Sequence, residues 1–475
     1  MAKFNQTQTN KTVNKSGHVA YKMGDKEKLI TQVLTSFFNE SKFYGDNSKD
    51  MQETIERVVK TDPAFIAKLA VFARKKFNMR SVSHVLVSYL AHEVTGKPYT
   101  KETVKAVSLR GDDVTEIMAC YLSLFGKPIP NALKKGISEV LRGFDEYTLA
   151  KYKGEGKAVK MRDLLCLCRP TPKTKAQSEM WHRLLNDELE TPVTWETQLS
   201  ANGNNAETWE KLIDSGKVGY MALLRNLRNI LKANPSNVNK VLETIENPEN
   251  VKRSKQLPFR YLSAYKELND IAGSRVFDAL ENAVESSIEN MPKLSGTTVI
   301  AVDASRSMSG TISGKSNVRC YEIAMLLGLI ANKICDNSIF YTFNNSIAKY
   351  PVSSRNGILY TTLSARCGGG TDMGLPFAQM IKDNIKADRI IVISDNECNS
   401  GWFHEPVQTI ADKYRYRTGN DIWVHAIDLQ GYGTQQFYSK KTNIVAGWSE
   451  KVFEFIKLAE QGEGSLVDTI EHYKF

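Results

Sequence analysis

Long apolar runs are absent from this sequence of 475 residues. No stretch approaches the roughly 18 apolar residues that a membrane-spanning helix needs. The first twenty residues, MAKFNQTQTNKTVNKSGHVA, lack the apolar centre of a secretory signal. We therefore expect a chain without membrane contact that works in the cytoplasm.

Cysteine is scarce and scattered. The seven cysteines form an odd number, and the closest pair, Cys166 and Cys168, is separated by a single residue. This separation is not a zinc-ligand spacing, and the scatter does not suggest a disulfide framework. The sequence predicts reduced and mostly structural thiols.

Several sequence signatures of catalysis are also missing. The segment around Asp303 lacks the second Asp of a D-x-D-x-T phosphatase loop, and no G-x-x-x-x-G-K-[ST] loop occurs. The Gly-rich stretch CGGGTDMG, residues 367–374, does not follow an apolar strand as a dinucleotide-binding fingerprint would. We therefore expect a binding protein and not an enzyme.

The charge is distributed unevenly. The net charge is +10, with 63 Lys and Arg against 53 Asp and Glu. Residues 1–300 hold 45 basic and 35 acidic residues, so the remaining 175 hold 18 of each. Such asymmetry is typical of a polyanion-binding region joined to another domain, although a basic but merely soluble surface is the alternative.

Residues 26–290 show the pattern of apolar residues that is typical of short helices. Apolar residues recur at spacings of three and four in AFIAKLAVFARKKF, VGYMALLRNLRNILKA and RVFDALENAVESSI. Breakers such as KTDPAF, GKPIPNA and ANPSN separate these stretches. The pattern predicts a stack of helices, either a HEAT-like solenoid or an irregular all-α domain.

The pattern changes near MPKLSG, residues 291–296. Apolar strands, TTVIAVD, SIFYTFN, RIIVISD and DIWVHAID, then alternate with helical stretches. This alternation predicts a doubly wound, parallel α/β sheet, so the fold class is all-α followed by α/β. We predict three segments: a disordered polar and basic tail over residues 1–20, a helical-repeat domain over 21–292 and the α/β domain over 293–475.

Oxygen-bearing side chains follow the ends of the predicted strands. Asp303, Ser305 and Ser307 alternate in DASRS, and Asp395 closes a later strand. Ligands of such sheets bind at the carboxyl ends of the strands. With Thr371 of the Gly-rich loop, these residues resemble the metal-ion-dependent adhesion site of von Willebrand factor A domains. The alternative is a strand-to-helix turn in which Asp303 and the serines act only as caps.

The adhesion-site resemblance implies that these five oxygen-bearing residues hold Mg²⁺ or another divalent cation. Hard oxygen ligands suit that ion. It also implies that a carboxylate of another protein, or a phosphate, completes the coordination, so that the site docks a partner.

A wider resemblance covers nearly the whole chain, from about Val19 to the C-terminus. VFARKKFNMRSVSH, FDEYTLAKYKG, MRDLLCLCRPTP, YMALLRNLRNIL and LPFRYLSAYKEL, followed by GGTDMGLP and SDNE, resemble the TROVE-domain Ro family. The resemblance implies a ring of HEAT-like repeats closed by the A domain. It also implies a monomeric ribonucleoprotein component in RNA quality control or stability.

In this family, small noncoding Y RNAs bind the basic outer surface, and single-stranded 3′ ends of structured or misfolded RNAs enter the central hole. The A domain would then recruit a protein partner such as an RNA-processing enzyme. The rival interpretation is a protein-adhesion scaffold that acts through the A-domain metal site alone.

Basic residues for phosphate contacts cluster in three segments of the helical part. Because each neutralised phosphate releases counterions, such contacts make affinity fall with salt. The predicted RNA contacts are Arg74, Lys75, Lys76, Arg80, Lys134, Lys135, Arg142, Lys151, Lys153, Lys160, Arg162 and Arg169. Phe77, Tyr147 and Tyr152 lie among these cations and could stack on bases, although each residue taken alone is more often part of a core.

Overall fold

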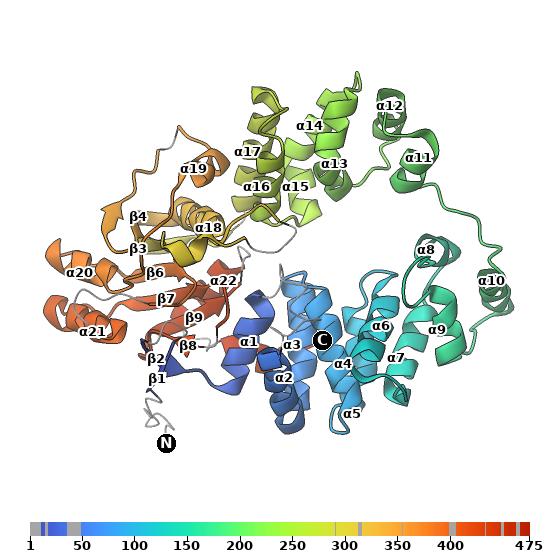
Figure 1. Ribbon diagram of the computed structural model, residues 1–475, viewed down its shortest axis with the longest axis horizontal. Helices are drawn as coiled ribbons and strands as arrows, with labels where there is room; N and C mark the ends of the chain where they lie inside the picture. The colour runs from blue at the N-terminus through green and yellow to red at the C-terminus, as the bar shows by residue number, and fades with distance from the viewer. Residues whose placement is uncertain are drawn as a thin grey trace. The chain divides into compact units, whose positions relative to one another are not determined.

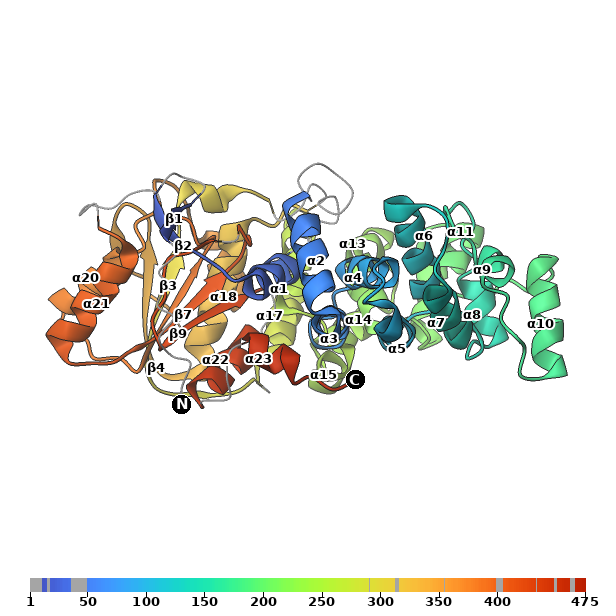
Figure 2. The same ribbon diagram turned by 90° about the horizontal axis from the view of Figure 1, so that it is seen from below.

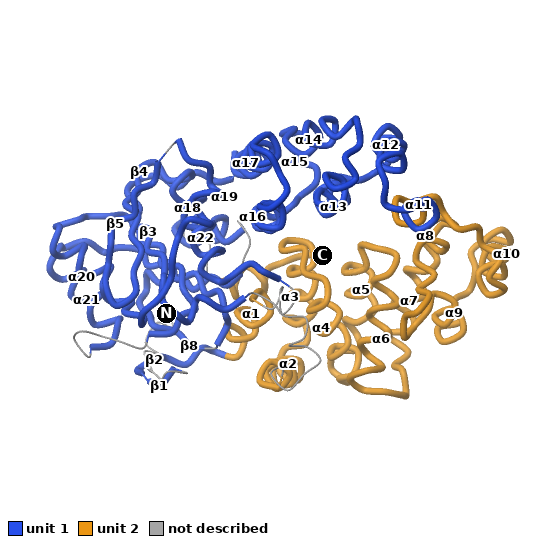
Figure 3. The backbone as a smooth tube through the Cα atoms, turned by 45° about the horizontal axis from the view of Figure 1, so that its top comes forward, with its two compact units in different colours: residues 1–24, 198–465 blue, residues 25–197, 466–475 orange. Residues whose placement is uncertain are grey.

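The chain folds into two compact units, residues 1–24 with 198–465 and residues 25–197 with 466–475 (Figure 3). The computed structural model describes residues 11–14, 18–35, 49–289, 291–311, 316–353, 355–398, 405–432, 434–447, 451–461 and 466–475. In these ranges, no helix is both long enough and apolar enough to cross a bilayer. The unit of residues 25–197 and 466–475 is called the helical unit below, and the other the sheet unit.

The helical unit is a stack of short helices (Figure 1). Its helices are α1 (Asp25–Thr35), α2 (Lys49–Thr61), α3 (Pro63–Lys76), α4 (Ser81–His92), α5 (Lys97–Val107), α6 (Asp113–Phe125), α7 (Asn131–Leu141), α8 (Glu146–Lys151), α9 (Met161–Cys168), α10 (Lys175–Leu185) and α23 (Leu466–Glu471). Helix α11 (Trp195–Asn202) spans the border between the units.

Local sequence explains where these helices begin, and apolar faces explain how they stack. Helix α3 has Pro63 in its first turn, and its N-cap Asp62 accepts a hydrogen bond from the Phe65 backbone N–H at 3.0 Å. Helices then pack on others one to three places further along the chain: α3 on α4 and α5, α4 on α6, α5 on α7, and α6 on α9. This pairwise stacking agrees with the stack of short helices that the spacing of apolar residues predicts.

The sheet unit begins with its own helices. These are α12 (Ala206–Asp214), α13 (Tyr220–Ala233), α14 (Val238–Glu246), α15 (Pro248–Ser254), α16 (Pro258–Glu267) and α17 (Ser274–Ile288). Helix α17 packs against α14, α15 and α16, and also against helices of the α/β part that follows.

The α/β part is a six-stranded sheet with the strand order β5-β4-β3-β6-β7-β9. Its strands are β3 (Leu294–Asp303), β4 (Cys335–Phe343), β5 (Ile347–Lys349), β6 (Arg389–Ser394), β7 (Trp423–Asp428) and β9 (Thr442–Ala446). Only β5, at one edge, runs antiparallel to its neighbour, and the remaining pairs are parallel. The predicted fold class is confirmed.

Helices cover both faces of this sheet (Figure 1, Figure 2). The helices are α18 (Cys320–Ile334), α19 (Ile358–Ser364), α20 (Leu375–Lys382), α21 (Val407–Thr418) and α22 (Val452–Glu460), with the short 3-10 helix η4 (Arg306–Ser309) after β3. Val299 and Ala301 of β3 belong to the core that α20 and α21 complete.

The opposite face of the sheet carries α18 and α22. Gly328 of α18 allows a close approach there: a Cβ atom at Gly328 would lie 2.7 Å from Val302 Cγ2 and 2.8 Å from Phe340 Cζ.

The N-terminal segment differs from the prediction of a disordered tail over residues 1–20. Within its described residues, β1 (Lys11–Val13) pairs with β2 (Val19–Lys22), and β2 pairs with β8 (Thr434–Gln435). Asn14 also donates a hydrogen bond to the Cys398 carbonyl at 2.7 Å. The prediction missed the pairing of β2 with β8 because these strands lie more than 400 residues apart in the sequence. Residues 1–10 lie outside the described residues.

The change from helix to strand falls where the sequence indicates it, between Ile288 and Leu294. The compact units do not divide there, because α17 is tied to the α/β part. The Glu281 carboxylate accepts hydrogen bonds from the backbone N–H groups of Leu359 at 3.0 Å and Tyr360 at 2.9 Å, at the start of α19. Lys266 of α16 also pairs with Glu322 of α18 at 2.7 Å.

Candidate functional site

The first part of the site is the turn after β3. Asp303 is fully buried at the end of the strand, and its Oδ1 accepts a hydrogen bond from the Ser305 backbone N–H at 2.8 Å. The Ser305 and Ser307 hydroxyl oxygens are 2.9 Å apart, with Ser305 buried and Ser307 exposed. The turn therefore lines up three oxygen-bearing side chains from the buried strand end to the surface.

The Gly-rich loop is held against this turn by backbone hydrogen bonds. The Gly368 N–H donates to the Ala304 carbonyl at 2.7 Å, and the Arg306 N–H donates to the Gly369 carbonyl at 3.0 Å. Asn344, just after β4, donates from its side chain to the Gly368 carbonyl at 2.8 Å. These bonds hold the loop that carries the buried Thr371 beside the strand end.

Two carboxylates meet at this edge of the sheet. Asp395 directly follows β6, the neighbour of β3, and it is 1% exposed. Burial raises the pKa of Asp303 well above its ordinary value, and the nearby Asp395 charge raises it further. Both side chains are buried at the ends of neighbouring parallel strands, so neither carboxylate is well solvated.

A third buried carboxylate, which the sequence reasoning missed, belongs to Asp428 at the end of β7. Its Oδ1 accepts hydrogen bonds from the backbone N–H groups of Gln430 at 2.8 Å and Gly431 at 2.9 Å. Burial, followed by the charges of Asp395 and Glu397, raises its pKa to about 7. The available signal was its place as the last residue of DIWVHAID, at the same sheet edge as Asp303 and Asp395.

The donor set fits a hard divalent cation. Asp303 Oδ2 is buried and has no hydrogen-bond partner among the described residues, so an electropositive group there would satisfy it. The described residues contain no group of three or more His, Cys, Asp or Glu side chains that could hold a metal ion. The candidate metal ligands are two carboxylates and three neutral hydroxyls. That they bind a metal ion stays a prediction.

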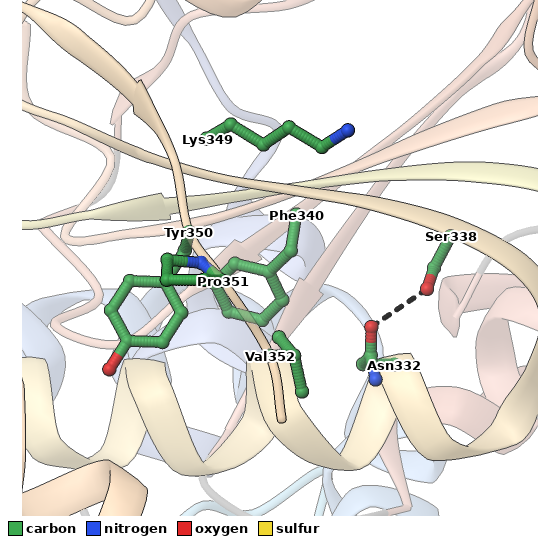
Figure 4. Close-up of a pocket in the computed structure, with 7 residues that line it drawn as sticks. All are labelled: Asn332, Ser338, Phe340, Lys349, Tyr350, Pro351 and Val352. Atoms are coloured by element: carbon green, nitrogen blue, oxygen red, sulfur yellow. Dashed lines mark hydrogen bonds between the residues drawn. The ribbon is translucent and has the colours of Figure 1, made fainter. Parts of the chain in front are cut away.

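A cavity of about 480 Å³ lies elsewhere in the sheet unit, beside the edge strand β5 (Figure 4). Phe340, Tyr350 and Val352 form much of its wall, and the Ser338 hydroxyl donates a hydrogen bond to the Asn332 side chain at 2.7 Å. Ser338 pairs with Thr298 near the start of β3, whereas Asp303 is the last residue of β3. The cavity contains none of the candidate metal ligands.

The structure separates the predicted RNA contacts into two groups, of which the first is engaged inside the helical unit. The Arg74 side chain is 7% exposed, pairs with the buried Asp113 at 3.0 Å and donates to the Val107 carbonyl. Arg80 pairs with Asp112 at 2.9 Å and also with Asp113. The prediction is wrong for Arg74, because its guanidinium compensates a buried carboxylate, and Arg80 is largely committed to the same network.

Two further cations have acidic partners nearer the surface. Lys153 pairs with Asp187 at 2.9 Å and donates to the Leu189 carbonyl, and Arg142 pairs with Glu139 at 3.3 Å. These pairs reduce the positive charge that the two residues offer to a phosphate.

The second group keeps its charge available. Within the described residues, no ion pair forms at Lys75, Lys76, Lys134, Lys135, Lys151, Lys160, Arg162 or Arg169. Lys75 and Lys76 are exposed in the last turn of α3, and Lys134 and Lys135 lie on α7.

The three aromatic residues named with these cations also differ. Phe77 is buried and belongs to the core of the helical unit. Tyr147 of α8 is 51% exposed, and Tyr152, which follows α8, is partly buried. Only the two tyrosines are therefore placed to meet a ligand.

Comparisons with known proteins agree with this architecture. A family model of the TROVE domain matches residues 14–188 and 186–275, more than half of the chain, and a model of the Ro60 vWA domain matches residues 297–431. The crystal structure of the Deinococcus radiodurans RO (RSR) protein superposes with a TM-score of 0.66 at 17% identity. That superposition covers 93% of this chain and all of the other.

Two curated relatives match by sequence over about half of the chain. The RNA-binding protein RO60 of Caenorhabditis elegans is 26% identical over 245 residues, which are 48% of this chain and 38% of that protein. Telomerase protein component 1 of Rattus norvegicus is 23% identical over 326 residues, 51% of this chain and 12% of the relative. The match therefore spans well under half of the length of either relative.

Proposed function

The chain belongs to the TROVE-domain Ro family, and from this membership we propose that it is an RNA-binding component of a ribonucleoprotein. Its helical unit provides the phosphate contacts. In this proposal the chain acts by binding RNA and does not catalyse a reaction.

The observation that carries this proposal is a set of cations on the helical unit that have no acidic partner among the residues that the structure describes. Lys75 and Lys76 end α3, and Lys134 and Lys135 lie on α7. A lysine already paired with a carboxylate must lose that interaction to bind phosphate, whereas these four do not. Electrostatic contacts of this kind supply most of the non-specific affinity for nucleic acid and make it depend on salt.

The first test neutralises these cations. Changing Lys75, Lys76, Lys134 and Lys135 together to Gln should weaken RNA binding and flatten the dependence of log K on log salt by up to roughly 3, at about 0.7 for each lost contact with a single strand. The matched control removes four exposed lysines of the sheet unit, Lys349, Lys382, Lys386 and Lys440. Equal effects of the two variants on affinity and slope would contradict the proposal.

The finer part of the proposal concerns which RNA is bound. Small noncoding, Y-like RNAs bind the basic outer surface of the family's ring, and single-stranded 3′ ends of structured or misfolded RNAs enter its hole, in a quality-control or stabilising role. RNAs that are identical except for a single-stranded 3′ tail distinguish these modes. The tailed RNA should bind more tightly than the blunt one, and equal affinities would remove threading while leaving RNA binding intact.

A second activity is favoured by the buried carboxylates at the sheet edge. We propose that Asp303, Ser305, Ser307, Thr371 and Asp395 hold Mg²⁺ or a similar cation, and that a protein partner docks there through a carboxylate. The bound ion would offer one of its coordination positions to that carboxylate. The chain's own residues bury two like charges and align neutral hydroxyls, which leaves the ion undercompensated.

Calorimetry on the full chain tests the metal proposal without any partner. Mg²⁺ and Mn²⁺ should bind the unaltered chain and should not bind Asp303→Ala, while Asp336→Asn, at an exposed carboxylate of β4, should bind like the unaltered chain. Tailed-RNA binding should survive Asp303→Ala. If millimolar metal does not bind the folded chain, these residues act only as a hydrogen-bonded turn.

A further inference from the structure

Four side chains form an aromatic and cationic surface on the helical unit, which we call the platform: Arg110, Tyr147, Lys151 and Tyr152. The Lys151 ammonium lies 5.5 Å from the centre of the Tyr147 ring and 5.7 Å from that of Tyr152. The Arg110 guanidinium lies 5.9 Å from the Tyr152 ring centre. Two tyrosine rings and two cations thus alternate on one surface.

Local packing, a helix cap and an ion pair hold the residues of the platform in place. Tyr152 packs onto Gly111 so closely that a Cβ atom at Gly111 would lie 2.4 Å from its ring. Helix α8, which carries Tyr147 and Lys151, is capped by Asp145, whose side chain accepts from the Thr148 N–H at 2.8 Å. The same helix is tied to α10 by the two-pronged ion pair between Arg183 and Glu146, at 2.7 and 2.6 Å. A ligand would therefore meet a preformed surface, which limits the ordering cost of binding.

Exposure shows which parts of the platform remain available. The Tyr147 ring is about half exposed, and Leu109, beside Arg110 in the preceding turn, is 53% exposed. Lys151 is exposed and has no ion pair within the described residues, while Arg110 pairs with Asp112 at 3.2 Å but keeps 55% of its side-chain surface exposed. The Tyr147 side chain and the two positive charges are thus exposed to solvent together.

We propose that the platform is a stacking site for the unpaired bases of single-stranded RNA, with Tyr147 as the main stacking ring and Lys151 as a contact to the adjacent phosphate. Every base has a π face, so stacking of this kind tolerates many sequences. Alternation of rings with cations matches the alternation of bases with phosphates along a strand. This inference rests on the proposed RNA-binding function. It assigns residues to the contacts with bases, which the phosphate contacts do not provide.

The test compares ring and charge variants of the full chain against a labelled single-stranded oligonucleotide. Tyr147→Ala should weaken binding about fivefold or more, since loss of one stacked base costs ~1–3 kcal/mol and each tenfold in affinity is about 1.4 kcal/mol. Tyr147→Phe keeps the ring and should bind normally. Lys151→Gln should flatten the salt slope by about 0.7, the value for one lost contact with a single strand, whereas Tyr147→Ala should leave the slope unchanged.

A series of oligonucleotides with one abasic site at successive positions tests stacking directly. At one position the missing base should weaken binding to the unaltered chain but not to Tyr147→Ala, because the partner ring is already gone. Tyr416→Ala on α21 is the matched control, as that ring is 90% exposed but lies in the sheet unit. Thermal melting checks that each variant is folded.

The outcomes separate this inference from the function on which it rests. If the four-lysine variant loses affinity while Tyr147→Ala binds as tightly as the unaltered chain, the stacking site is wrong and the proposed RNA binding stands. If an acidic peptide binds the platform and no abasic position couples to Tyr147, the platform is a protein-docking surface instead. If no RNA binds the unaltered chain, both proposals fall.

Discussion

Asp428→Asn should make the sheet unit more stable at neutral and alkaline pH. The substitution keeps an oxygen to accept from the Gln430 and Gly431 N–H groups, and it removes a buried negative charge beside Asp395. In the unaltered chain, burial raises the Asp428 pKa from 3.8 to about 7. A carboxyl group with a raised pKa in the fold opposes folding whenever it must ionise, so its cost grows as the pH rises towards that pKa.

The magnitude follows from the two pKa values. At about 1.36 kcal/mol for each pH unit, the full penalty is ~4 kcal/mol above pH 7 and falls to ~1.6 kcal/mol at pH 5, where the folded chain keeps the proton. The difference in free energy of unfolding between Asp428→Asn and the unaltered chain should therefore grow by ~2.6 kcal/mol between pH 5 and pH 8. Below the ordinary value of 3.8 it should vanish.

Urea unfolding at several pH values, in the presence of a chelator, measures this difference. Asp336→Asn, at an exposed carboxylate of β4, is the control and should show little change with pH relative to the unaltered chain. If the difference between Asp428→Asn and the unaltered chain stays constant from pH 5 to pH 8, burial does not hold the proton on Asp428 and the electrostatic description of the sheet edge is wrong.

Two further predictions concern the cores. Arg74→Ala should lower the free energy of unfolding by about 3–5 kcal/mol, because it leaves the fully buried Asp113 with less compensation, and a loss below about 1 kcal/mol in urea would contradict that role. Gly328→Ala should lower the free energy of unfolding by about 1–3 kcal/mol, because the added methyl group would overlap Val302 and Phe340. If this variant melts at the same temperature as the unaltered chain, α18 can move away from the sheet.

The local pattern of the sequence was sufficient for the element types. The period of the apolar residues distinguished the helices from the strands, and the four predicted strands correspond to β3, β4, β6 and β7. The strands that were missed, β1, β2, β5, β8 and β9, are only two to five residues long, and β8 exists through pairing with β2, more than 400 residues before it. Strands of that length carry too little alternation to be recognised locally.

The candidate metal residues could be found for a related reason. Parallel strands end at one edge of a sheet, so the positions of Asp303 and Asp395 at the ends of apolar strands are enough to predict that the two carboxylates lie together. Asp428 satisfies the same rule and was missed because it lies outside the five-residue motif. Its raised pKa depends on burial, which the sequence does not display.

The sequence by itself determined the change from a helical part to alternating strands and helices, the family motifs and the supply of positive charge in the first 300 residues. Only the tertiary structure decided which of those charges are available to an anionic ligand. Arg74 is neutralised by Asp113, 39 residues away, and Lys153 by Asp187, 34 residues away, while Lys75 has no such partner among the described residues. Secondary structure follows from spacings of a few residues, whereas an ion pair depends on which helices the core brings together, and that is a property of the folded chain.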